Sequence, residues 1–164
     1  AVYLEKRAQS DRDSVATVGM LNVPSGSINV VPGRCQFSLD MRAPTDVQRD
    51  ALVDDVLREL SDICDRRGLH HTLVETVRAS AAPSNPAMQA GWEAAVKATG
   101  LPVFKLPSGA GHDAMKLHEV MPQAMLFVRG ENGGISHNPL ESTTADDMQL
   151  GFAAMLHFLN HFQP

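Results

Sequence analysis

Three segments determine the predicted fold of the second half of the chain. They are Leu106-Pro-Ser-Gly-Ala-Gly-His-Asp-Ala114, the apolar run Ala124-Met-Leu-Phe-Val128, and Arg129-Gly-Glu-Asn-Gly-Gly-Ile-Ser-His-Asn-Pro-Leu-Glu141. We interpret them as a buried strand between two polar loops, which present His112 and His137 as open α/β sheets present functional side chains. Positive φ angles, which glycine adopts without strain, are expected at the glycines of these loops, Gly109, Gly111, Gly133 and Gly134.

Composition limits the classes of function. The chain has 164 residues, of which 43% are hydrophobic and 20% charged, as in a soluble globular protein of one domain or two small ones. A net charge of -5, without a block of Lys or Arg, argues against nucleic acid and anionic membranes as partners. Cys35 and Cys64 lie in apolar periodic segments, so we expect core thiols in a reducing, cytoplasmic compartment rather than a disulfide or ligand pair.

The first half alternates between strand and helix patterns. Residues 1–7 are typical of the last turns of a helix, and residues 14–23 and 34–42 predict two strands. The second strand has an apolar face of Cys35, Phe37, Leu39 and Met41 and a polar face of Arg34, Gln36, Ser38, Asp40 and Arg42. A helix then begins at residues 43–46 and ends at Gly68, and residues 69–77 predict a third strand. This order predicts an α/β sandwich of the ferredoxin-like kind that lacks its first strand.

Small residues and two prolines at residues 79–86 predict a domain boundary, with domains at residues 1–82 and 83–164. In the second domain we expect a helix over residues 86–99, short strands near Val103 and over residues 123–128, and a final helix that begins after Thr144. The buried stripe expected for that final helix is Met148, Phe152, Met155, Leu156 and Leu159, and the stripe expected for the helix before Gly68 is Val53, Val56, Leu57, Leu60, Ile63 and Cys64.

The spacing of the polar residues leaves each functional interpretation open. His137 is either a metal ligand or a surface-loop histidine, and a single ligand makes no site. His112 is either an acid/base or substrate-orienting group or part of a helix N-cap region. Asn29 and Arg42 form either a clamp for a carboxylate or a turn Asn and a surface Arg, and spacing alone favours the latter. The pair His157 and His161 is a weak candidate for metal binding.

Three motifs together carry a resemblance to a known family. They are T-V-G-M-L-N-V-P-S-G-S-I-N-V-V-P-G-R-C-Q-F-S-L-D-M-R, P-S-G-A-G-H-D-A and M-L-F-V-R-G-E-N-G-G-I-S-H-N-P-L-E, in this order. In these residues the chain closely resembles the hydantoinase/carbamoylase-type amidases from about Asp13 to Phe162. That group includes N-carbamoyl-L-amino-acid hydrolase, allantoate amidohydrolase and β-ureidopropionase, within the dinuclear zinc carboxypeptidase and aminoacylase superfamily.

The resemblance implies an architecture and a reaction. Residues 1–82 would be the later part of a lid and dimerisation domain, and residues 83–164 the C-terminal part of a zinc-carboxypeptidase-like α/β catalytic domain. The reaction would be metal-dependent hydrolysis of a ureido or carbamoyl C-N bond in an N-carbamoyl amino acid or allantoate. Two divalent ions, Zn or Mn or Co, would polarise the carbonyl and activate a water. A homodimer through the lid is implied as well.

The resemblance also implies roles for individual residues. His137 in I-S-H-N-P matches the last metal ligand of the family, and Asn29 and Arg42 match its carboxylate-binding lid residues. Gly111 and His112 match the loop that contacts the substrate, with His112 as the catalytic candidate.

The remaining metal ligands and the general base of the family would precede Ala1, so we expect the chain to be a C-terminal fragment that is inactive alone. Two alternatives stay open. One is an aminoacylase or peptidase of the same superfamily, and the other is a non-catalytic binding or dimerisation module.

Overall fold

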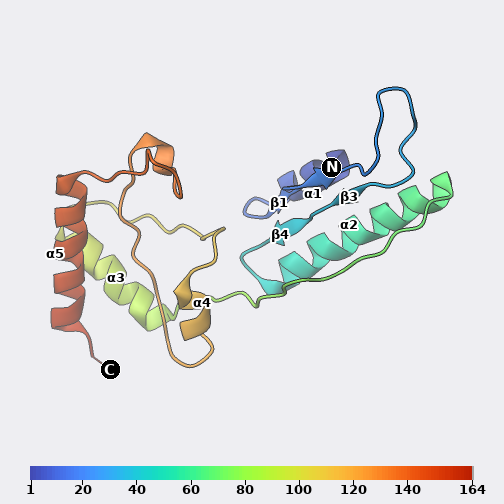
Figure 1. The fold of residues 1–164 in the computed structure, drawn as a ribbon. Helices are drawn as coiled ribbons and strands as arrows, with labels where there is room; N and C mark the ends of the chain where they lie inside the picture. Colours follow the sequence, from blue (N-terminus) through green and yellow to red (C-terminus); the bar gives the residue numbers. More distant parts are fainter. Residues whose placement is uncertain (164) are drawn as a thin grey trace. The chain divides into compact units, whose positions relative to one another are not determined.

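The computed structural model describes residues 1–163, and its ribbon is shown in Figure 1. The described chain forms two compact units. The first contains Ala1–Ala81 together with Pro107–Gly111, and the second contains Ala82–Leu106 and the residues from His112 onward. Across the described residues, no helix is both long enough and apolar enough to cross a membrane. The described residues are mainly helical with two small sheets, so the complete sandwich and the complete catalytic domain stay predictions.

The first unit consists of two helices and a two-stranded β-ribbon, which is formed by the strand pairs β1–β4 and β2–β3. Helix α1 (Val2–Gln9) confirms the helix expected at the start of the chain. Strand β1 (Val15–Thr17) pairs antiparallel with β4 (Asp40–Arg42), and β2 (Leu21–Asn22) pairs antiparallel with β3 (Gln36–Phe37). The two expected strands are therefore present as four short ones, and the register sets Val15 opposite Arg42 and Leu21 opposite Phe37.

The core of the first unit lies where the helices meet one end of this ribbon. The cluster of buried side chains at this point consists of Leu4 of α1 and Leu52 and Val56 of α2. The ribbon contributes the half-buried residues Ala16, Val18, Leu39 and Met41. The apolar face expected for residues 34–42 is therefore confirmed only at Leu39 and Met41. Cys35 and Phe37 are exposed, contrary to expectation, because only the β1–β4 end of the ribbon packs against the helices.

Helix α2 (Asp46–Arg67) begins and ends as its sequence predicts. The Thr45 hydroxyl accepts a hydrogen bond from the Gln48 amide at 3.2 Å, which satisfies one of the free donors of the first turn. Gly68 ends the helix with a φ of 63°, in the left-handed region that glycine adopts readily. Val56 and Cys64 are buried as expected, whereas the most deeply buried side chain, Leu52, was not in the expected stripe.

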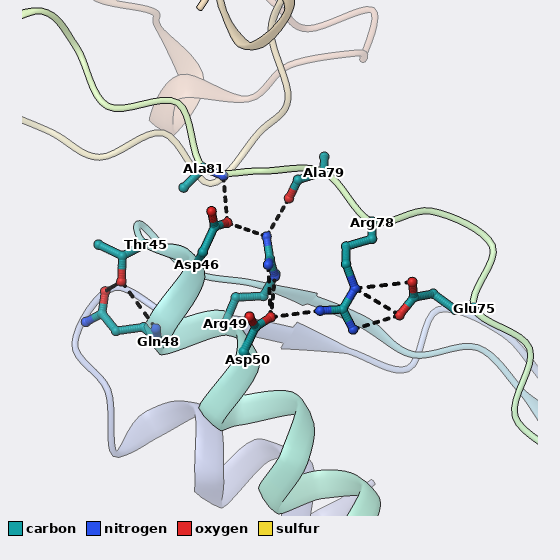
Figure 2. Close-up of polar contacts among 9 residues, drawn as sticks. All are labelled: Thr45, Asp46, Gln48, Arg49, Asp50, Glu75, Arg78, Ala79 and Ala81. Carbon is teal, nitrogen blue, oxygen red and sulfur yellow. Dashed lines mark hydrogen bonds and ion pairs between the residues drawn. The ribbon is translucent and has the colours of Figure 1, made fainter. Parts of the chain in front are cut away.

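The third strand expected over residues 69–77 is wrong. The segment pairs with no strand of the described chain, and Leu73 and Val77 are exposed. Its continuation to Ala81 is instead tied to the start of α2, as Figure 2 shows. Arg49 Nη1 donates to the Ala79 carbonyl, and the Asp46 carboxylate accepts from the Ala81 amide at 2.8 Å. Side-chain bonds to α2 thus hold Ala79 and Ala81, whereas the segment before them forms no sheet ladder in the described chain.

The second unit is built around two packed helices. Helix α3 (Pro86–Ala98) confirms the helix expected there, and Asn85 caps it by accepting from the Met88 amide. Helix α5 (Ala145–His161) is capped by Thr144, whose hydroxyl accepts from the Asp147 amide at 3.0 Å. The helices meet through stacked rings of Trp92 and Phe158, with centroids 4.1 Å apart, and through buried Ala95 and Ala154.

Other expectations for the second unit are wrong. The strands near Val103 and over residues 123–128 have no ladder partner among the described residues. The buried Gln123 instead donates its side-chain amide to the carbonyls of Ala82 and Pro83. On α5 the stripe expected to be buried is exposed, because α3 packs against the face that carries Ala154 and Phe158; the exposed residues are Met148, Phe152, Met155, Leu156 and Leu159.

Candidate functional site

The first candidate, Arg42, is the last residue of β4 and is engaged by a carboxylate on the same strand. Its Nε donates to Asp40 Oδ1 at 2.8 Å, and its Nη2 donates to Asp40 Oδ2 at 2.5 Å. Residues two apart on a strand share a face, so the sequence D-x-R already places the two side chains together. The Arg42 guanidinium, chiefly through this hydrogen bonding, holds the pKa of Asp40 below its ordinary value, and Asp40 in turn raises the pKa of Arg42.

The third bond of Arg42 reaches the loop that was expected to contact the substrate. Nη1 donates to the Gly109 carbonyl at 2.9 Å, and Gly109 belongs to the segment Pro107–Gly111 of the first unit. Gly111 is exposed, but neither Gly109 nor Gly111 has a positive φ angle, contrary to expectation. Positive φ angles do occur at Gly133 and Gly134, where they were predicted.

Asn29 lies on the connection between β2 and β3, and its Oδ1 accepts from the Ser27 hydroxyl at 3.2 Å. This connection leaves the ribbon at its Asn22–Gln36 end, whereas Arg42 pairs with Val15 at the opposite end. Val15 and Asn22, at the two ends, are seven positions apart in nearly extended chain, or roughly 20 Å at the usual rise of a strand. The structure therefore does not bring Asn29 and Arg42 of one chain together into a fork. Their separate roles in binding a carboxylate stay predictions.

His112 occupies the N-cap position of the short helix α4 (Asp113–Leu117), without a capping bond from its side chain. Its ring meets the ring of Phe127 edge to face, with centroids 6.1 Å apart. The side chain is exposed. Placement at a helix start agrees with one of the two interpretations of the sequence, and the acid/base role stays a prediction.

His137 lies on an exposed loop whose backbone is held by a carboxylate. The residue has a φ of 56°, which is uncommon for a side chain other than glycine. Glu141 accepts a hydrogen bond from its backbone amide at 2.9 Å. The ring Nδ1 lies 3.2 Å from the Ser136 hydroxyl. A histidine held in this way can present its other ring nitrogen to solvent or to a ligand.

The start and end of this loop are joined to each other by further hydrogen bonds. The loop passes through the 3-10 turn η1 (Asn132–Gly134), and the Asn132 side chain donates to the Leu140 carbonyl at 2.7 Å. The Ser142 hydroxyl donates to Glu131 at 2.8 Å, and the Glu131 amide donates to the Ser142 carbonyl. The His137 loop is therefore fixed by its own side chains.

Sequence reasoning missed the residues that support the candidates. Asp40 and Glu141 engage Arg42 and His137 directly. A signal was present in each case: an acid two residues before an arginine on one strand face, and an acid four residues after a histidine in a Gly- and Pro-containing loop.

A metal centre is not assembled by residues 1–163 themselves. In this part of the chain, no three His, Cys, Asp or Glu side chains are close enough to hold an ion. His157 and His161 are stacked with ring centroids 4.1 Å apart, and His161 Nδ1 is engaged with the His157 carbonyl. Because zinc requires three or four ligands, the residues present do not fit a complete site, and His137 remains a single candidate ligand.

The comparison with known families matches almost the whole chain. Residues 3–161 match the model of peptidase family M20/M25/M40, and the chain belongs to this family. Within it, the similarity is to hydantoinase/carbamoylase-type amidohydrolases, as the three sequence motifs predicted. The family consists generally of enzymes with two metal ions.

Curated relatives and solved structures agree on this branch of the family. An N-carbamoyl-L-amino acid amidohydrolase of Geobacillus stearothermophilus is 33% identical over 94% of the chain, and an allantoate deiminase of Arabidopsis thaliana is 35% identical over 96%. The chain spans 37% and 33% of their lengths. A hydantoinase/carbamoylase family amidase from Burkholderia multivorans superimposes with a TM-score of 0.87 at 31% identity, over 96% of this chain and 38% of that one.

Proposed function

We propose that the protein containing this chain hydrolyses the C-N bond of a ureido or carbamoyl group on a small carboxylate, in a metal-dependent reaction. N-carbamoyl amino acids and allantoate are the proposed substrates. The observation that supports this most is the identity of 31–35% to N-carbamoyl-amino-acid and allantoate amidohydrolases over nearly the whole chain. The exposed His137, held on a fixed loop, supports a ligand role within that reaction.

In this proposal each candidate residue has a separate task. Arg42 binds the substrate carboxylate with its guanidinium, and Asn29, which lies at the other end of the paired strands, contacts substrate separately through its side-chain amide. Gly111 and His112 contact the reacting group, with His112 moving or holding a proton there. His137 holds one metal ion together with ligands from outside this chain.

A second candidate is hydrolysis of an acyl-amide bond, as in an aminoacylase or peptidase. The description of the matching family as a peptidase family favours it. Arg42 would bind the carboxylate of an acyl-amide substrate equally well, because both classes of substrate carry a carboxylate. The two candidates differ in the bond that is cut.

The test is an assay of the whole gene product that contains these residues. Ammonia release is measured from allantoate and from a panel of N-carbamoyl-L-amino acids, and N-acetyl-L-amino acids serve as substrates for the second candidate. We expect ammonia release that a chelator abolishes and a divalent ion restores. Release of acetate without ammonia would replace the first candidate by the second, and no hydrolysis of either class would contradict both.

Two substitutions test the roles in that assay. Loss of a charged hydrogen bond costs about 1.5–3 kcal/mol, so Arg42→Ala should raise KM for the carboxylate substrate by about 10- to 100-fold with little change in kcat. His137→Ala should lower the bound metal measured by elemental analysis, whereas His70→Ala, at another exposed histidine, should leave it unchanged. Equal metal content in both variants would exclude His137 as a ligand.

We also propose that the protein is a cytoplasmic homodimer that associates through its first unit. Light scattering on the purified gene product measures the dimer directly. A monomer at the concentrations of the assay would contradict this assembly.

A further inference from the structure

The guanidinium of Arg42 is held at three points by its own chain. The Asp40 carboxylate accepts hydrogen bonds from Nε and Nη2, along one edge of the guanidinium. The Gly109 carbonyl accepts one hydrogen bond from Nη1. The side chains of both Arg42 and Asp40 are half exposed, at 51% and 50%, so the group is fixed and still open to solvent.

This arrangement leaves a defined part of the guanidinium available. A guanidinium has five N-H donors, and the structure uses one on each of its three nitrogens. One N-H therefore remains on Nη1 and one on Nη2. A carboxylate has two acceptor oxygens and pairs most strongly with two N-H groups at once. The remaining donors are of the kind and number that one more carboxylate can accept.

We propose that Asp40 is a positioning residue for substrate recognition, which holds Arg42 by one edge so that its remaining terminal N-H groups are presented to the substrate carboxylate. The inference rests on the proposed function, in which Arg42 binds that carboxylate. Asp40 itself does not touch the substrate.

The physical reason lies in the length of the arginine side chain. A free arginine on a strand samples many rotamers, and ordering it on binding subtracts from affinity. Asp40 and Gly109 order the guanidinium before the substrate arrives. The opposite role is that of a competitor, in which Asp40 must leave before a substrate carboxylate can bind. The two roles predict changes of opposite sign in KM when Asp40 is replaced.

The chain offers a matched control at a second arginine-carboxylate pair. Arg78 binds Glu75 through Nε and Nη2, with bonds of 3.1 Å and 2.8 Å to Oε2, and these side chains are similarly exposed, at 49% and 54%. Figure 2 shows this pair beside the start of α2. Glu75→Gln therefore removes a similar ion pair that has no contact with Arg42 or with the Gly109 loop.

The experiment measures KM and kcat of the whole gene product for the preferred N-carbamoyl amino acid or for allantoate. Ordering a side chain costs about 0.5–1.5 kcal/mol, so Asp40→Ala should raise KM by about 2- to 10-fold at unchanged kcat. Asp40→Asn should lie between Asp40→Ala and the wild type, because its amide oxygen still accepts from Nε. Glu75→Gln should leave both constants unchanged.

A double substitution shows whether Asp40 acts through Arg42. In an Arg42→Ala background, Asp40→Ala should cause no further rise in KM. A carboxamide analogue of the substrate, which lacks the carboxylate, should bind wild type and Asp40→Ala equally well. A purely structural role of Asp40 would raise KM in both backgrounds and for both compounds, and would overturn the inference.

The outcomes separate this inference from the proposed function. If Arg42→Ala raises KM but Asp40→Ala leaves it unchanged or lowers it, positioning is wrong and the carboxylate clamp stands. If Arg42→Ala changes nothing while ammonia is still released, the clamp and the positioning role are both wrong and the hydrolysis stands.

If the wild type hydrolyses nothing, the proposed function fails. Calorimetric titration with the same carboxylates then compares wild type and Asp40→Ala, and equal affinity or no binding overturns the inference as well.

Discussion

Helices α2 and α5 begin in the same way and bury their apolar residues differently. Each has a threonine N-cap, Thr45 or Thr144, whose hydroxyl accepts from the amide three residues later. Each was also predicted to bury an apolar stripe. Helix α2 buries Leu52, Val56 and Cys64, two of which were predicted. Helix α5 buries Ala154 and Phe158, neither of which was predicted, and leaves its predicted stripe exposed.

The difference teaches what a helical periodicity can and cannot predict. An apolar stripe predicts a helix that gains stability when the stripe is covered. Helix α2 finds its cover in α1 and the ribbon of the first unit. Helix α5 contacts α3 through a face of small residues and one ring, and Phe152 on its other face is 67% exposed.

The largest expected effect comes from a matched pair of phenylalanines on α5. Phe158 is 8% exposed and stacked on Trp92, whereas Phe152 is 67% exposed. Phe158→Ala should lower the free energy of unfolding by about 3–5 kcal/mol, and Phe152→Ala by no more than about 0.5 kcal/mol. Urea unfolding of the 164-residue chain measures both.

The same pair, placed in the whole gene product, sharpens the comparison. A rise in the cost of Phe152→Ala to the level of Phe158→Ala would mean that another part of that protein covers the exposed face of α5. Equal costs already in the 164-residue chain would contradict the packing of α5 described above.

A smaller effect, equal in the two helices, is expected at the caps. Thr45→Ala and Thr144→Ala should each cost about 1 kcal/mol of stability, because a cap satisfies a backbone donor locally and does not depend on the face that is buried. Thr143→Ala is the control, since this exposed neighbour lies outside the cap. Thermal unfolding compares the three variants, and a cost at Thr143 equal to that at Thr144 would contradict the cap.

The smallest expected effect is a difference between the two units in how much stability each loses at acid pH. Four carboxyl groups of the first unit have pKa values lowered in the folded chain, chiefly by hydrogen bonds: Asp40, Asp46, Asp55 and Glu75. Among the described residues of the second unit, only the carboxyl group of Glu93, which is bound by Lys105, has a lowered pKa. A lowered folded pKa gives stability that is present above the unfolded value, about 4, and is lost as the pH falls through the folded value.

Acid should therefore weaken the first unit more than the second. The only tryptophan, Trp92, lies in the second unit, so its fluorescence reports that unit while ellipticity reports the whole chain. Below about pH 4 the ellipticity transition should move to lower urea before the fluorescence transition does. Asp46→Asn removes the carboxylate that binds the Ala81 amide and should reduce this separation. Transitions that shift together at every pH would contradict the assignment.

The candidate site was predictable in part, for physical reasons that differ between its residues. His137 on an exposed loop and Arg42 on a strand follow from glycine content and alternation, which are local properties. The wide separation of Asn29 from Arg42 follows from the register of the ribbon, which joins residues distant in sequence. The hydrogen bonding of Arg42 to Asp40 was predictable to an intermediate degree. Strand geometry places the two side chains on one face, but only their conformations show that they bond.

By itself the sequence determined helices α1, α2, α3 and α5, the starts of α2 and α5, the glycine that ends α2 and, through three motifs, membership in the M20 family. These features depend on neighbours within a few residues or on a pattern of residue types that the chain shares with the family. The tertiary structure alone decided that residues 69–77 and 123–128 pair with no strand of the described chain, that Cys35 is exposed, and which face of α5 is buried. The reason is that a ladder or a buried face exists only where another segment supplies the donors, acceptors or apolar surface that complete it.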